Sequence, residues 1–263
     1  TVFASVVPLV TFVEAVGGER VRALPMVLPG QSPAPYDPSP RQVSELSEAA
    51  AYFRVGVPFE NAWMKRIQAA NPAMAVVDLR DGLPLRTLEA HRHPDAHEAH
   101  GEAYGGDHRE ALHDHDQQHD HHSEAKDPHI WTSPKLVRRM AAQIRDSLTR
   151  LDPEGADEYA ANQAAFDAEL VALDQALRER LDDLENRRFL VYHPAWGYFA
   201  DAYDLTQVTI EFEGKEPGAR QLAALIDQAK TEGTRVVFVQ PEFDQRAARQ
   251  VAKAIGGRVE ALN

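Results

Sequence analysis

Histidine carries most of the chemistry that this chain could perform. Ten of its twelve histidines lie between His91 and His122, and only His129 and His193 lie outside that segment. Neutral imidazole binds divalent cations, and so do the carboxylates that accompany it here. We therefore interpret the segment as a tract that captures metal ions weakly at several sites. The alternative is a solvated acidic spacer whose histidines do nothing specific.

The same segment is expected to form a mobile loop. Residues 91–127 hold ten acidic and three basic residues, so they contribute −7 of the formal charge of −13. Leu112 is their only large aliphatic side chain and Tyr104 their only aromatic one. Such a composition cannot bury enough apolar surface to offset the entropy lost on ordering. A tract of this kind binds metals with little selectivity, so it does not define the function by itself.

Two histidines and one aspartate stand at the ends of predicted elements. His129 lies in a proline-marked turn at 127–134, just before a helix. His193 closes a strand and precedes Pro194, which cannot continue a strand ladder. Asp244 follows the strand at 235–239. Each has a structural alternative, because a histidine near a strand end is commonly hydrogen-bonded within the fold and Asp244 would be a suitable helix N-cap.

The composition excludes several classes of protein. A chain of 263 residues is expected to form one or two domains, and it contains no cysteine. Disulfides, thiolate zinc sites, iron–sulfur ligation and cysteine nucleophiles are therefore excluded. The 41 acidic residues exceed the 28 basic ones, so we expect no nucleic-acid partner. No apolar run approaches the ~18 residues of a membrane span. Residues 2–7 are predicted to form a buried strand rather than part of a signal peptide.

Strands alternate with helices in both halves of the chain, which predicts an α/β fold with parallel sheets. In the first half, strands are expected at 2–7, 21–28, 52–57 and 73–79, with helices at 9–16, from Ser39 onward and at 59–70. In the second half, strands are expected at 189–192, 207–211, 235–239 and 258–262, with helices at 196–203, 217–231 and 244–255.

Two helices separate the halves. One starts at Pro134, and the other runs over 156–184 with an apolar stripe along one side. The second would be roughly 44 Å long, enough to run along two lobes and join them stiffly. The predicted domains are an N-terminal lobe at 1–133 that carries the loop 91–127, linking helices at 134–186, and a C-terminal lobe at 187–263. Ligands bind beyond the carboxyl ends of strands in such sheets, which points to 31–35, His129, His193 and 240–244.

Several motifs together resemble the cluster A-I metal-binding proteins of bacterial ABC importers, in the zinc branch of ZnuA-like proteins. The most specific are Asp-Pro-His-Ile-Trp at 127–131 and Tyr-His-Pro-Ala at 192–195. A long His-rich acidic insertion before Asp-Pro-His is also usual in that branch. The matching stretches follow the order of the family, cover nearly the whole chain, and lie at 29–33, 36–40, 56–60, 127–131, 191–199, 216–219 and 238–244.

The resemblance implies two α/β lobes joined by a rigid long helix, with one metal ion in the cleft between them. It implies His129 and His193 as ligands, and imidazole at 193 favours Zn²⁺ over manganese. Asp244 matches a position that supplies a carboxylate in several members, with Glu242 and Glu60 as fallbacks. It further implies a periplasmic, monomeric solute-binding protein that delivers zinc to an ABC permease with its ATPase. An accessory periplasmic zinc carrier is a further expected partner.

One position departs from the family pattern. Members have a histidine in the Ser-Pro-His segment, where this chain has Ala34. Alanine cannot bind a metal, so this is either an engineered substitution or one that another ligand compensates. The remaining set of His129, His193 and Asp244 leaves a coordination position for water or a loop histidine. We therefore expect weaker binding than with the full set.

Three other functions share parts of this pattern. Two histidines, a carboxylate and an open position also describe a catalytic zinc hydrolase. The chain has no His-Glu-x-x-His and no Gly-x-Ser-x-Gly sequence, so we expect no enzymatic activity. A zinc store or surface adhesin of the same fold is the second alternative. Import of manganese is the third, and competition between the two metals would distinguish it.

Overall fold

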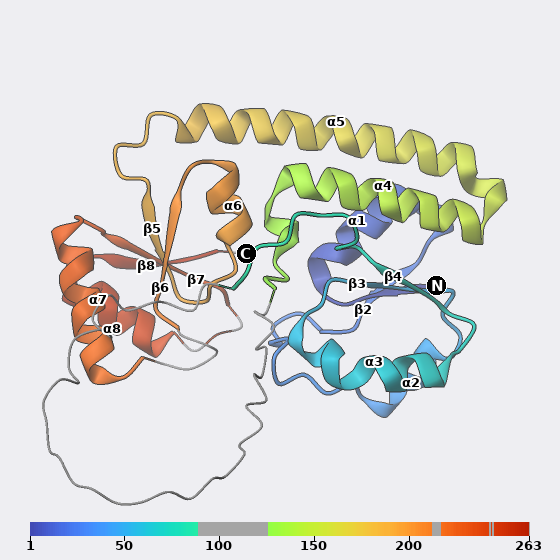
Figure 1. Ribbon diagram of the computed structural model, residues 1–263, viewed down its shortest axis with the longest axis horizontal. Helices are drawn as coiled ribbons and strands as arrows, with labels where there is room; N and C mark the ends of the chain where they lie inside the picture. Colours follow the sequence, from blue (N-terminus) through green and yellow to red (C-terminus); the bar gives the residue numbers. More distant parts are fainter. Residues whose placement is uncertain (89–125, 212–216, 242, 244, 263) are drawn as a thin grey trace, which may run out of the picture.

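The computed structural model describes residues 1–88, 126–211, 217–241, 243 and 245–262. Within these ranges the chain forms two four-stranded parallel sheets, each flanked by helices, and the two lobes lie side by side (Figure 1). The predicted α/β class with two parallel-sheet lobes is therefore confirmed. The predicted His-rich loop lies outside the described residues, and its metal-capturing role stays a prediction.

The first sheet has the strand order β2-β1-β3-β4. Helices cover both of its faces, with α1 and α4 on one and α2 and α3 on the other (Figure 1). Its strands are β1 (Val2–Ala4), β2 (Ala23–Pro25), β3 (Ala51–Arg54) and β4 (Ala75–Asp78). Its helices are α1 (Val7–Gly17), α2 (Pro40–Leu46), α3 (Pro58–Ala70) and α4 (Pro134–Leu151).

The second sheet repeats that arrangement with the order β6-β5-β7-β8. Its strands are β5 (Arg188–Val191), β6 (Thr206–Thr209), β7 (Val236–Val239) and β8 (Arg258–Ala261). Helices α6 (Gly197–Ala202), α7 (Ala219–Thr231) and α8 (Arg246–Ala254) complete this lobe. Because all strands in each sheet are parallel, their carboxyl ends meet at one edge, where ligands of open α/β sheets bind.

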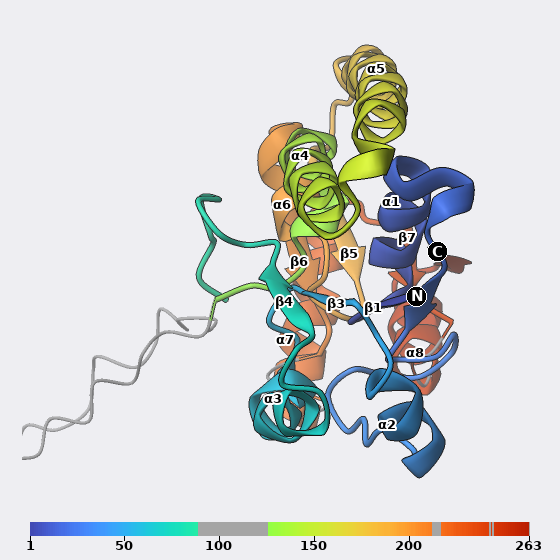
Figure 2. The same ribbon diagram turned by 90° about the vertical axis from the view of Figure 1, so that its right-hand side faces the viewer.

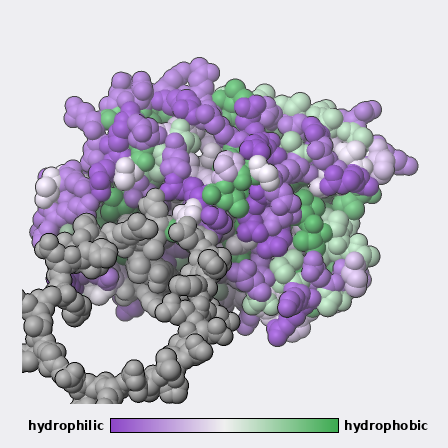
Figure 3. All heavy atoms as spheres, viewed as in Figure 1, coloured by the Kyte–Doolittle hydropathy of each residue, from purple (hydrophilic) through white to green (hydrophobic). Residues whose placement is uncertain are grey.

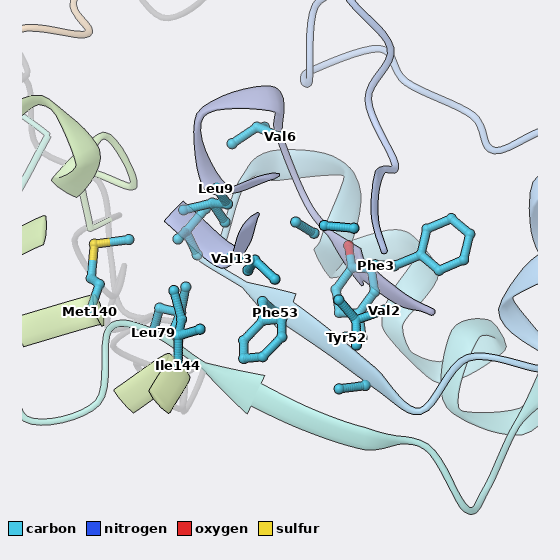
Figure 4. Packing of buried hydrophobic residues seen from close by; sticks show 14 of the residues in the cluster. Val2, Phe3, Val6, Leu9, Val13, Tyr52, Phe53, Leu79, Met140 and Ile144 are labelled. Atoms are coloured by element: carbon cyan, nitrogen blue, oxygen red, sulfur yellow. The ribbon is translucent and has the colours of Figure 1, made fainter. Parts of the chain in front are cut away.

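The apolar core is larger in the first lobe. Phe3, Leu9 and Phe53 from the sheet and α1 meet Met140 and Ile144 of α4 there, and all five side chains are at most 1% exposed (Figure 4). Helix α4 therefore packs as part of the first lobe, although the prediction assigned it to the linking segment. The predicted domain limits themselves stay predictions.

Helix α5 (Ala156–Leu181) is the element that runs along both lobes. Its 26 residues span about 39 Å. It packs on α4 and α1, and it extends past them over the second lobe (Figures 1 and 2). There the hydroxyl of Tyr203 donates to Asp174 of α5 at 3.0 Å. Tyr159 and Leu170 are buried, whereas Leu173 is 47% exposed and Leu177 and Leu181 are half-buried, so the predicted apolar stripe is only partly covered.

One face of the molecule is shown in Figure 3. The face seen in Figure 3 is mostly hydrophilic, with only separate hydrophobic areas over the described elements. Among the described residues, no helix combines the length and apolar character needed to span a membrane.

Candidate metal centre

The side chain of Asp127 holds both the backbone and the ring of His129 in place. The backbone N–H of His129 donates to Asp127 Oδ1 at 2.9 Å, and its ring Nδ1–H donates to the same oxygen at 2.7 Å. Pro128 and the 3₁₀ turn η2 (Ile130–Thr132) make this turn compact, and Asp127 is only 4% exposed. Since the Nδ1 proton faces a carboxylate, the free lone pair of this imidazole is on Nε2.

His193 has an equivalent arrangement in the second lobe. It lies two residues after the end of β5, and its Nδ1–H donates to Glu211 Oε2 at 3.2 Å. Glu211 follows the neighbouring strand β6 and is 6% exposed. The parallel pairing of β5 and β6 brings their carboxyl ends together, which places the carboxylate beside the imidazole. Here too the free lone pair is on Nε2.

The two free nitrogens face each other across the lobe boundary. His129 Nε2 and His193 Nε2 lie 3.4 Å apart, beyond the usual range of an N–H···N hydrogen bond. Two nitrogens bound at 2.0–2.1 Å to one ion at the tetrahedral angle are about 3.3–3.4 Å apart. The observed separation therefore matches two ligands of one tetrahedral zinc ion.

Aromatic side chains enclose the imidazole pair on both sides. The ring of Phe243 stacks on His193 at 4.6 Å between centroids, and Trp131 meets His129 edge-on at 5.1 Å. Burial lowers the pKa of His129, while Asp127 opposes that shift. The neutral form that binds a metal is therefore favoured at neutral pH.

The other predicted site residues divide into three cases. Asp244 and Glu242 lie outside the described residues, so their predicted roles stay predictions. Ala34 is exposed in the connection between β2 and α2, where its N–H donates to Ser32 Oγ at 3.4 Å. Glu60 is fully buried within the first lobe.

The contacts of Glu60 explain its burial. Its two oxygens accept from Arg54 Nε at 3.1 Å, from the backbone N–H of Gly56 at 2.7 Å, and from the hydroxyl of Ser5. These donors satisfy the carboxylate internally, which counts against Glu60 as a metal ligand. In the parts of the chain that the structure describes, no group of three or more potential ligands surrounds one point.

Comparison with known proteins identifies the family. The profile of the family described as zinc-uptake complex component A, periplasmic, matches residues 2–263. The chain belongs to this zinc-uptake component A family. It is a family of metal-binding components of transport systems and not of enzymes.

Solved structures and sequence relatives of the zinc-uptake component A family agree. A crystal structure of ZnuA is 37% identical, covers 99% of this chain and 89% of its own, and superposes with a TM-score of 0.84. A ZnuA deletion mutant with zinc bound is 36% identical with a TM-score of 0.83, covering 99% of this chain and 88% of its own. The zinc-binding lipoprotein AdcA of Streptococcus pneumoniae is 27% identical over 97% of this chain. The chain spans about half the length of the AdcA relatives, 48% in that case.

Sequence reasoning identified the two imidazoles but missed the carboxylates that orient them. Asp127 is part of the Asp-Pro-His motif, and Glu211 is the last residue of the strand predicted at 207–211. The available signal was the position of Glu211 at the carboxyl end of the strand beside the one that precedes His193. Neighbouring parallel strands end together, so the carboxylate and the imidazole come close.

Proposed function

We propose that this chain captures Zn²⁺ between its lobes and delivers it to the permease of an ABC importer. The observation that carries the proposal is the pair of Nε2 atoms 3.4 Å apart, each on an imidazole whose Nδ1 is held by a buried carboxylate. This arrangement aims two preoriented lone pairs at one point between two lobes. The two imidazoles are called the interlobe site below.

Asp244 is proposed as the third ligand. It follows Phe243, whose ring stacks on His193, so the chain passes close to the interlobe site at this position. A water molecule or a histidine of the segment 91–122 would complete a tetrahedral site, because Ala34 supplies no donor. The ligand set His129, His193 and Asp244 contains two imidazoles, which suit zinc better than manganese.

The proposed partners follow from family membership. The zinc-loaded chain would dock on a membrane permease driven by an ATPase, and it would act in the periplasm or at the outer face of the membrane. The long helix α5 contacts both lobes, which supports delivery with small local movements rather than wide hinge closure. An accessory zinc carrier and a monomeric state are part of the same proposal.

Zinc titration against a tight chromophoric chelator tests the proposal. Residues 91–122 are deleted so that the His-rich segment cannot bind metal. Thr87 and Lys126 form a β-bridge, so six residues would connect two ends that are already adjacent. We expect one tight zinc equivalent that a large excess of manganese does not displace. If no single zinc equivalent binds, or if manganese displaces it, the proposed function is wrong.

The affinity of the interlobe site should depend on pH. Zinc binds neutral imidazole, so affinity is full above the pKa of the ligands and falls as pH drops below about 6.5. Burial lowers the pKa of His129, so protonation of this imidazole reduces zinc affinity only toward the acid end of this range. Chelator competition from pH 7.5 to 4.5 measures the profile. An affinity that stays constant down to pH 5 would indicate a carboxylate site instead.

A further inference from the structure

A tyrosine hydroxyl joins the two lobes beside the interlobe site. Tyr198 belongs to α6 of the second lobe, is 5% exposed, and packs with the core of the first lobe. Its hydroxyl donates to the carbonyl oxygen of Asp127 at 2.9 Å and accepts from the backbone N–H of Arg86 at 2.9 Å. Burial raises the pKa of Tyr198 to about 12, so the hydroxyl keeps the proton that it donates.

The residues around this hydroxyl form a continuous set of contacts. The backbone N–H of Asp127 donates to the carbonyl of Arg86 at 3.0 Å, and the Arg86 guanidinium forms an ion pair with Asp201 of α6. Gly197 allows the close approach, since a Cβ there would lie 2.8 Å from Arg86 Nε and 3.1 Å from Asp127 Oδ2. The first turn of α6 therefore lies directly against the residue that orients His129.

We propose that Tyr198, Arg86 and Asp201 form an interlobe clasp that positions Asp127 and, through it, His129 relative to His193. The three are positioning residues and touch no metal. Asp127 is held by its backbone on the clasp side and holds His129 by its side chain, so a shift of its backbone moves the imidazole. The inference rests on the proposed function, because it assigns a determinant of zinc affinity at the same site.

The main test compares Tyr198→Phe with Tyr203→Phe in the full chain. Both tyrosines are buried residues of the second lobe, and the hydroxyl of each bonds to a residue outside that lobe. Tyr203 bonds Asp174 of α5, away from the interlobe site. The zinc equivalent of the interlobe site is defined as the one lost in a His129→Ala, His193→Ala double variant. We expect Tyr198→Phe to weaken that equivalent about tenfold, the lower end of the loss seen when a ligand's direct outer partner is removed, because Tyr198 acts on His129 through Asp127. Tyr203→Phe should change it less than twofold.

Hydrogen exchange of the His129 backbone N–H in the metal-free chain provides a readout that does not need zinc. It should accelerate about tenfold in Tyr198→Phe and stay unchanged in Tyr203→Phe, because only Tyr198 restrains the acceptor, Asp127. Parent-like affinity and exchange in Tyr198→Phe would overturn the clasp. If the parent chain binds no zinc at the interlobe site, the proposed function is wrong. The hydrogen-exchange rates of Tyr198→Phe and Tyr203→Phe would then still show whether the clasp positions Asp127.

If Tyr198→Phe does not fold, a substitution at an exposed residue of the clasp tests the same proposal. Asp201→Asn weakens the ion pair with Arg86 at a carboxylate that is 59% exposed. Asp146→Asn is its control, since Asp146 is 54% exposed and pairs with Arg145 on α4. We expect the first to lower interlobe zinc affinity about threefold and the second to leave it unchanged. Equal affinities in the two variants would count against the clasp.

Discussion

Replacing His193 by alanine will weaken zinc binding at the interlobe site at least about 100-fold. Structural zinc sites bind with about 10–16 kcal/mol shared among four ligands, or about 3 kcal/mol per ligand. Each 1.4 kcal/mol corresponds to tenfold in affinity, so one lost ligand costs about two orders of magnitude. Chelator competition in the chain without residues 91–122 measures the loss.

A second variant tests the orientation of the His193 imidazole separately from its role as a ligand. Glu211→Gln keeps the imidazole but replaces the carboxylate that accepts its Nδ1 proton at 3.2 Å. We expect a loss of about tenfold, since removing such an outer partner costs about 10- to 100-fold. Glu60→Gln is the matched control, because Glu60 is equally buried but contacts Arg54 and Ser5 instead of an imidazole. Unchanged affinity in His193→Ala would mean that zinc binds elsewhere.

Replacing Ala34 by histidine should raise zinc affinity by about 10- to 100-fold. The connection that holds Ala34 follows β2 at the carboxyl edge of the first sheet, and its side chain is exposed, so an imidazole fits there without repacking the core. The new ligand would replace water, which contributes less binding free energy than a protein imidazole.

Gln31→His is the control for that experiment. Gln31 is exposed in the same connection but lies three residues before Ala34, the position where the family resemblance implies a histidine. It should leave the affinity of the interlobe site unchanged in a chain without residues 91–122. An equal gain in both variants would mean that any added histidine binds zinc, and no gain in Ala34→His would exclude this position as a ligand.

Local signals in the sequence predicted the elements well. Ser39 is the N-cap of α2, and Pro40 is its first residue, as predicted. Each predicted strand also has a counterpart in the structure. Strand lengths were less accurate. The strand predicted at 2–7 ends at Ala4 because Val7 and Pro8 begin α1. The strand predicted at 21–28 is shorter in the structure and covers only Ala23–Pro25.

Long-range contacts account for what sequence reasoning missed. The apolar spacing of α5 is uniform along the helix, but α4 and α1 cover only the part that lies over the first lobe. The imidazoles of His129 and His193 could be placed by the rule for strand ends and by resemblance. The hydroxyl of Tyr198 could not, because its two partners are 71 and 112 residues away along the chain.

A β-bridge between Thr87 and Lys126 joins the two ends of the stretch that contains the His-rich segment. Lys126 Nζ also donates to the Thr87 hydroxyl at 3.1 Å, so the intervening stretch leaves and rejoins the fold at one place. Doubling the length of a stretch closed in this way costs only about 0.6 kcal/mol in loop entropy. The length and histidine content of this stretch can therefore vary over evolution, or be exchanged by design, without displacing His129 and His193, the proposed ligands.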